Sequence, residues 1–232
     1  MSRLISEDFN KLCGFITSYS LSCILENKEV VKLLSTYHKK YYGYLVFIEK
    51  LHQAKEKNEL SESQYDYLQE SCSDIGQAFF LLFHGCYKGA KLLLRSSIEN
   101  YLKGICLDED SSLPKTKSVY EVFDKAKVTT VFSDIKIGLH DKIHNEYALL
   151  CKDVHTADKT HMASVSALKD FPSFDKKQAD MVTKFVLRLV PIYITLLALK
   201  FNKIYHEMDP LYKEVTNKEI LNDFKKKVHN VE

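Results

Sequence analysis

The chain has 232 residues, 45% of them hydrophobic, and a formal net charge of +2. This length allows one large or two small domains, and the hydrophobic content supplies a sizeable core, which excludes wholesale disorder. The small net charge excludes a strong overall field toward nucleic acid or membrane surfaces, although a local basic groove remains open. Only 7 glycines and 4 prolines are present, and this shortage of turn residues favours long helices over strands.

Two long helical patterns occupy the first half of the chain. Residues 6–57 predict one long helix or two in tandem, with Asn27 and Gly43 as candidate interruptions. After the polar stretch KEKNELSES, Ser61 with a glutamine three residues later matches a capping box and starts the next helix. Apolar side chains then recur at spacings of three and four, so we expect one continuous central helix over 62–106.

Shorter elements and a final apolar helix make up the second half. We expect, in chain order, a loop over 107–118, a short helix over 118–127, a short extended segment over 127–132, a helix over 133–157 and a boundary at 170–175. The last long helix starts near Asp175 and continues past Lys203, with a bend at Pro191. Its apolar run LVPIYITLLAL is too short to span a bilayer, and it predicts a buried core helix with no membrane role.

These patterns together predict an all-α protein, a bundle of four to five long helices with short extra helices. We expect a single helical-bundle domain over 1–205, followed by a polar C-terminal extension over 206–232. The six cysteines form no C-x-x-C pair and no zinc-module spacing, so we interpret them as reduced, mostly buried thiols of a cytoplasmic protein. No cofactor and no metal are predicted.

An aromatic run, YHKKYYGYLVF over 37–47, allows two interpretations. Rings interleaved with lysines can stack on single-stranded nucleic acid. The same spacing is typical of a helix with an aromatic core face and solvated lysines, which is the interpretation we favour.

A first polar cluster lies in LLLRSSIENYLKG, where Arg95 and Glu99 are four residues apart on one helical face. Their neighbours on that face are apolar, so we expect both side chains to be at least half buried, and a buried charge needs a partner. Arg95 is one of only three arginines beside thirty lysines, which fits a need for planar, bidentate hydrogen bonding. Arg95 and Glu99 are either a structural ion pair or part of a functional site.

A second polar cluster follows one stripe of a later helix: His140, His144, Tyr147, Cys151 and His155 are spaced by four, three, four and four residues. The stripe borders an apolar one, so its histidines are partly desolvated, and each can act as an acid or base, a metal ligand or a structural hydrogen-bonding group. The HDKIH segment has metal-ligand spacing but lacks the glutamate of the zinc-protease motif and an evident third ligand. The roles of His140 and His144 stay open.

The two clusters together carry a resemblance. LLRSSIENYLKG followed by YALLCKDVH resembles a loose group of bacterial α-helical proteins with R-S-x-x-E and Y-x-x-L-S-x-x-V-H motifs, placed near the HEPN helical bundles. Membership implies a four- or five-helix bundle, and many HEPN proteins are metal-independent ribonucleases of toxin or antiphage systems, completed across a dimer. The matching positions are Arg95, Glu99, Tyr147 and His155.

This chain departs from the family in two places. Cys151 stands where the group has serine, and none of the three arginines is followed by histidine at the R-x(4-6)-H spacing of the HEPN nucleases. The nearest approximation, Lys136 to His140, has lysine in place of arginine and a shorter spacing. The second departure weighs against nuclease activity.

Two functions therefore remain. The first is a metal-independent effector acting on RNA or a nucleotide in bacterial defence or toxicity, present as a homodimer or with a partner protein. In it Arg95 holds a phosphate, Glu99 orients Arg95 or His155, His155 is the acid or base, and Tyr147 donates a hydrogen bond. The second is a non-catalytic module for protein interaction or ligand binding, in which the same four residues lock two helices together.

Overall fold

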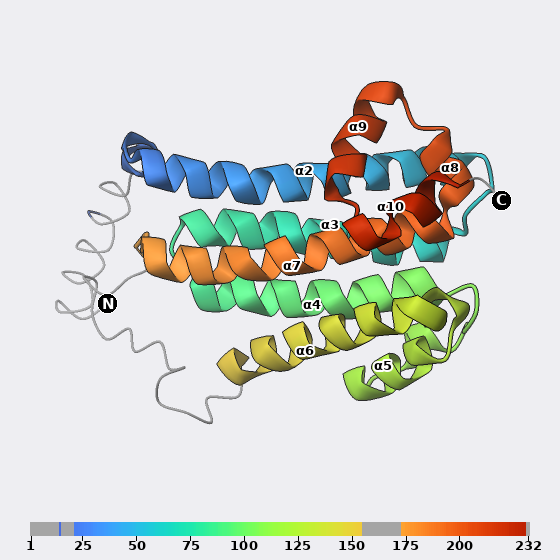
Figure 1. Cartoon of the computed structure of the whole chain (residues 1–232). Coiled ribbons are helices and arrows are strands. Elements are labelled where there is room, and N and C mark those ends of the chain that lie inside the picture. The colour runs from blue at the N-terminus through green and yellow to red at the C-terminus, as the bar shows by residue number, and fades with distance from the viewer. Residues whose placement is uncertain (1–13, 15–20, 155–172, 231–232) are drawn as a thin grey trace.

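The computed structural model describes residues 14, 21–154 and 173–230, and these are helical with no strand among them. Figure 1 shows an elongated bundle in which the long helices run roughly along one axis. Five long helices form the body, as the sequence predicts: α2 Lys28–Glu56, α3 Glu62–Phe83, α4 Tyr87–Cys106, α6 Ile137–Val154 and α7 Lys176–Lys200. The shorter elements are 3₁₀ turns at Ser22–Glu26, Leu113–Lys115, Thr130–Phe132 and Asp134–Lys136, together with α5 Val119–Lys127, α8 Asn202–His206, α9 Pro210–Glu219 and α10 Asn222–His229.

Side-chain caps set the starts of several helices. The Asn27 side chain accepts hydrogen bonds from the backbone N–H groups of Glu29 and Val30, so Asn27 interrupts the expected 6–57 segment by starting α2. Ser61 caps α3 in the same way, and Ser118 and Asp175 cap α5 and α7. Gly43, the other candidate interruption, lies inside an unbroken α2. The part of 6–57 before residue 21 is outside the described residues, apart from Gly14.

The expected single helix over 62–106 is wrong. The structure breaks it into α3 and α4, an antiparallel hairpin that turns at residues 84–86. Gly85 has φ +79°, a conformation that side-chain-bearing residues rarely adopt, and a Cβ at this position would lie 2.3 Å from the carbonyl oxygen of Ser173. Helical periodicity continues through the break because both arms of the hairpin bury one face.

The expected extended segment over 127–132 is also wrong, because Thr130–Phe132 is a 3₁₀ turn. The Thr129 hydroxyl donates to the carbonyl of Ala126, and Glu109 accepts from the backbone N–H and the hydroxyl of Thr130. Side chains thus form the hydrogen bonds to backbone groups that, in a strand, a neighbouring strand would have to form. The following helix, expected over 133–157, begins at Ile137, and the described part of it ends at Val154.

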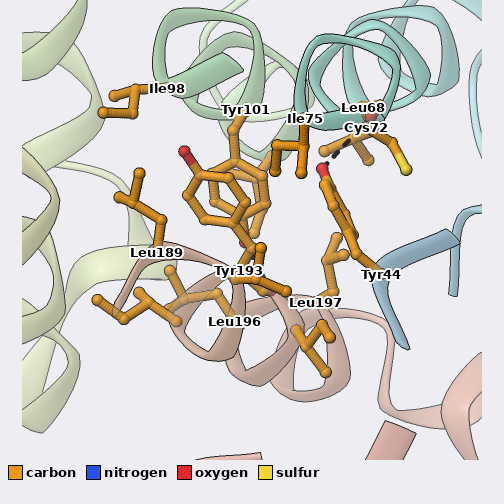
Figure 2. Packing of buried hydrophobic residues seen from close by; sticks show 14 of the residues in the cluster. Tyr44, Leu68, Cys72, Ile75, Ile98, Tyr101, Leu189, Tyr193, Leu196 and Leu197 are labelled. Atoms are coloured by element: carbon orange, nitrogen blue, oxygen red, sulfur yellow. Dashed lines mark hydrogen bonds between the residues drawn. The ribbon is translucent and has the colours of Figure 1, made fainter. Parts of the chain in front are cut away.

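Tyrosines occupy the centre of the core, at the meeting point of α2, α4 and α7 (Figure 2). The rings of Tyr101 and Tyr193 are stacked with centroids 3.8 Å apart, and Tyr44 meets Tyr193 edge-on. The Tyr101 hydroxyl donates to the Tyr193 carbonyl at 2.8 Å, and the Tyr44 hydroxyl donates to the Leu68 carbonyl at 3.3 Å. Tyr37, Tyr44 and Phe47 are fully buried, so the aromatic run over 37–47 is mainly a core face.

The most central helix is α7, which contacts α2, α3, α4 and α6. By length and composition it is the one helix in the described part of the chain that could cross a membrane, but 78% of its most apolar window is buried inside the bundle. It is therefore a core helix, as its apolar run predicts. Pro191 lies within it. The expected continuation past Lys203 is wrong, because the helix ends at Lys200 and a separate short helix, α8, follows after Phe201.

The segment after residue 205 packs onto the bundle. The helix α9 lies against α2, and α10 lies against α7 (Figure 1). Met208, Ile220, Phe224 and Val228 are buried in the same core as the long helices. This C-terminal segment, polar in composition, is thus a cap built on a few apolar anchors.

Of the cysteines, Cys72 and Cys106 are buried and Cys86 and Cys151 half-buried, all four as free thiols. Burial raises the pKa of Cys72 and of Cys106 to about 12, so both stay protonated at neutral pH. These two are inert core residues, as expected.

Candidate functional site

The helices α4 and α6 lie side by side and bring Arg95 together with Tyr147 and Cys151. The Arg95 Nη2 donates to the Tyr147 hydroxyl at 2.7 Å, and the Arg95 Nε donates to the Cys151 sulfur at 3.3 Å. Tyr147 and Cys151 are one helical turn apart on α6, so a single guanidinium reaches both. We call these three residues the Arg95 cluster.

Burial determines the state of the tyrosine. Tyr147 is only 2% exposed, and its ring packs edge-on against Phe123 of α5. Burial, together with the hydrogen bond to Cys151, raises the pKa of Tyr147 to about 12. Tyr147 is therefore a neutral phenol at neutral pH, with its oxygen occupied as an acceptor for Arg95.

The guanidinium of Arg95 is half-buried, and its hydrogen-bond partners among the described residues are a phenol and a thiol. Burial alone lowers its pKa, but the hydrogen bonds to Cys151 and Tyr147 outweigh burial and leave the pKa raised. Among the described residues, no carboxylate lies within 4 Å of it. In the part of the chain that the structure describes, Arg95 is thus a cation held by a phenol and a thiol with no carboxylate partner, which is suited to holding an anion.

The structure does not bring Glu99 to Arg95. The Glu99 carboxylate accepts a hydrogen bond from Lys103 at 2.7 Å, one turn further along α4. Glu99 has a cation four residues away on either side, and the Glu-before-Lys order is the more favourable arrangement on a helix. The sequence predicts that Glu99 orients Arg95, whereas the contact that Glu99 forms is with Lys103.

The bidentate arginine–glutamate pair lies elsewhere. Arg188 of α7 binds Glu146 of α6 through Nε at 2.5 Å and Nη2 at 2.7 Å. The Glu146 side chain is 11% exposed and that of Arg188 is 45% exposed. Sequence reasoning missed Glu146, although its place next to Tyr147 on a half-buried helix was a usable signal.

His140 and His144, whose roles were open, face α5. The His140 Nε2 donates to the Phe123 carbonyl at 3.0 Å, and the ring is buried against Phe123 and Phe132. The His144 ring meets the Phe123 ring at 4.8 Å. His140 is therefore a structural link between two helices. Within the described residues, no group of three or more His, Cys, Asp or Glu residues is arranged to hold a metal ion.

His155, the expected acid or base, lies outside the described residues. Of the four residues expected to form the site, the structure joins Arg95 and Tyr147, gives Glu99 a different partner and does not describe His155. Cys151, predicted to lie in the polar stripe and noted as a departure from the serine of the motif but not expected among the site residues, is the additional member that the structure places in contact with Arg95.

Comparisons with protein-family models, with curated proteins and with solved structures give no match to this chain. The likeness to HEPN bundles therefore rests on the two sequence motifs alone.

Proposed function

We propose that this protein binds a phosphate group of RNA or of a nucleotide at Arg95, as a metal-independent effector of bacterial defence or toxicity. The observation that supports this most is that the half-buried Arg95 guanidinium has no carboxylate partner among the described residues. A cation held away from bulk water among neutral partners interacts with an incoming phosphate more strongly than a solvated one does. Its Nη1 has no hydrogen-bond partner among the described residues, which leaves donors for a ligand.

The proposal gives each member of the site a distinct part. Arg95 holds the phosphate, and Tyr147 and Cys151 are positioning residues that fix the guanidinium plane. His155 remains the candidate acid or base, because arginine stabilises charge but does not transfer protons at neutral pH. In RNA cleavage of this kind, the base removes the proton of a 2′-hydroxyl, the 2′-oxygen attacks phosphorus, and the 5′-oxygen leaves with a proton. Neither the phosphate contact of Arg95 nor the proton transfer by His155 requires a metal ion.

A second candidate has its own support. Tyr147 is nearly inaccessible, and the Arg95 cluster joins α4 to α6 much as the Arg188–Glu146 pair joins α7 to α6. In a non-catalytic interaction or ligand-binding module, the Arg95 cluster would serve only to hold these helices together.

Matched arginine variants separate the two candidates. We expect Arg95→Gln to weaken binding of a single-stranded RNA by about tenfold, because one desolvated charged contact is lost. Arg188→Gln, which removes an exposed arginine that already has a carboxylate partner, should leave RNA affinity unchanged. Fluorescence anisotropy measures the affinity, and thermal melting verifies the folding of both variants. An Arg95→Gln protein that melts earlier but binds RNA as the wild type does would support the structural module.

A cleavage assay tests the catalytic part. With EDTA present, wild-type protein should cleave single-stranded RNA and His155→Ala should not, while Glu99→Gln should retain activity because Glu99 is paired with Lys103. Gel filtration with light scattering tests the proposed homodimer. Cleavage that requires added Mg²⁺ would contradict the metal-independent mechanism.

A further inference from the structure

A shallow cavity of about 410 Å³, open to solvent, lies in the C-terminal cap, distant in sequence from the Arg95 cluster and formed by α8, α9 and α10. Figure 1 shows these three helices gathered at one end of the bundle. The volume lies within the range of sites for small ligands, roughly 300 to 1,000 Å³. Its polar walls are Tyr205, His206, Lys213, Asn217 and His229.

Hydrogen bonds fix the ring of His206 at the wall of this cavity. Its Nε2 lies 2.9 Å from the carbonyl oxygen of Val228, so Nε2 carries the hydrogen and donates. Its Nδ1 lies 3.1 Å from the Lys213 ammonium, which donates to it. This pairing requires a neutral imidazole, because an Nδ1–H would point at the ammonium hydrogens. His206 therefore positions Lys213 without neutralising it.

Lys213 is a half-buried cation without a carboxylate partner. Among the described residues, no carboxylate lies within 4 Å of its nitrogen, which is held instead by His206 and lies 5.2 Å from the centre of the Tyr205 ring. Glu214 also lines the cavity, but its carboxylate binds Lys218 at 2.6 Å and is mostly solvated. The interior of the cavity is thus positive, with the negative group neutralised at its edge.

Further donors and an apolar surface complete the cavity. The His229 Nε2 donates to the Asn217 side-chain oxygen at 3.0 Å, which orders both side chains. The Tyr205 hydroxyl is buried and has no hydrogen-bond partner in the part of the chain that the structure describes, whereas buried hydroxyls ordinarily have one. Met208 adds a buried apolar wall.

From these contacts we infer that the cavity binds a small organic anion with a phosphate or carboxylate group, at a site separate from Arg95. Lys213 supplies the charge, Asn217 and His229 supply polar contacts, and Tyr205 with Met208 packs against the apolar part of the ligand. This inference is independent of the proposed action on RNA. It predicts that ligand binding links α9 to α10 and so stabilises the C-terminal cap.

Titration of the full chain with inorganic phosphate and with acetate tests the site, followed by the histidine ring signals in NMR spectra. We expect saturable shifts at His206 and His229 with at least one anion, and the one that binds more tightly identifies the acid group of the ligand. Lys213→Met should weaken binding by about tenfold or more and Lys213→Arg should restore part of it, whereas Lys226→Met, at an exposed position of α10 that does not line the cavity, should bind as the wild type does. Unsaturable shifts with both anions, or equal affinity in folded Lys213→Met, would overturn the inference.

Discussion

Arg95 and Arg188 show how neighbours decide what one residue type does. Arg95 is half-buried and Arg188 is more exposed. Both lie on helices that contact α6, and each makes two hydrogen bonds to α6. Arg188 meets a carboxylate, so its charge is neutralised and the pair is structural. Arg95 meets a phenol and a thiol and, in the described ranges 21–154 and 173–230, no carboxylate. The contrast depends on side chains over 50 residues away in sequence from Arg95.

The hydroxyl of Tyr147 is expected to stabilise the fold measurably. Tyr147→Phe removes the acceptor for Arg95 and leaves a half-buried guanidinium with one partner fewer. Hydrogen bonds to charged groups contribute about 1.5 to 3 kcal/mol, so we expect a loss of roughly 1 to 2 kcal/mol in the free energy of unfolding, measured by urea denaturation. Tyr120→Phe, at an exposed ring beside it, is the control and should be neutral. Identical midpoints for both variants would show that the bond contributes no stability.

Asp74 links stability to pH. Burial raises its pKa above the ordinary value of 3.8, although hydrogen bonds from Ser96 and Asn100 oppose the shift. A raised carboxyl pKa means that the folded state binds the proton more tightly than the unfolded state does. The charged carboxylate therefore destabilises the folded state, and this loss of stability is absent below pH 3.8 and complete above the raised pKa. Asp74→Asn should therefore gain stability relative to the wild type as pH rises through this window.

Denaturant melts at several pH values measure this effect. Asp66→Asn, at an exposed position of the same helix, serves as the control and should track the wild type. A stability difference between Asp74→Asn and the wild type that does not change with pH would contradict the assignment.

At the scale of elements, one glycine decides whether residues 62–106 are a rod or a hairpin. Gly85→Ala should destabilise the protein by about 2 kcal/mol or more, because alanine at positive φ costs roughly 1 to 2 kcal/mol and its Cβ would also meet Ser173. Gly138→Ala is the matched control: it lies in α6 with open space around a new Cβ, so we expect a gain of up to about 1 kcal/mol. Chemical denaturation of both variants measures whether each substitution lowers or raises the free energy of unfolding. Equal effects would mean that the turn does not depend on glycine.

At the scale of the whole molecule, buried tyrosines hold the bundle together and make it sensitive to alkali. Burial raises the pKa of Tyr37, Tyr44 and Tyr101 well above the ordinary value of 10. Since these phenols ionise near pH 10 only when unfolded, the stability that they confer falls as pH rises above 10. These buried tyrosines therefore stay protonated as long as the protein remains folded.

An alkaline titration checks this consequence. As the pH rises above 10, the helical circular dichroism should stay unchanged until Tyr37, Tyr44 and Tyr101 ionise. The tyrosinate absorbance of these buried rings should appear together with the loss of helicity, in one cooperative step. Full ionisation of the tyrosines with helicity retained would contradict the burial of these rings.

Much of the fold could be predicted because the signals are local. The shortage of glycine and proline indicated helices, and Ser61 and Asp175 marked helix starts through their own side chains. The break at Gly85 was missed because apolar periodicity is the same in a long helix and in two helices that bury a common face. The extended segment expected at 127–132 was wrong because the Glu109 side chain, from another turn, accepts hydrogen bonds from the backbone N–H and the hydroxyl of Thr130.

For the site, sequence by itself determined that Arg95 and Tyr147 lie on half-buried faces of two helices, since helical spacing alone orders residues around an axis. Only the tertiary structure decided that Arg95 and Tyr147 are in contact, that Glu99 binds Lys103 and that Arg188 binds Glu146. A helical pattern specifies which side of an element is buried but not which neighbour covers it. The charge left on Arg95, and with it the proposed phosphate site, is a property of how α4, α6 and α7 pack.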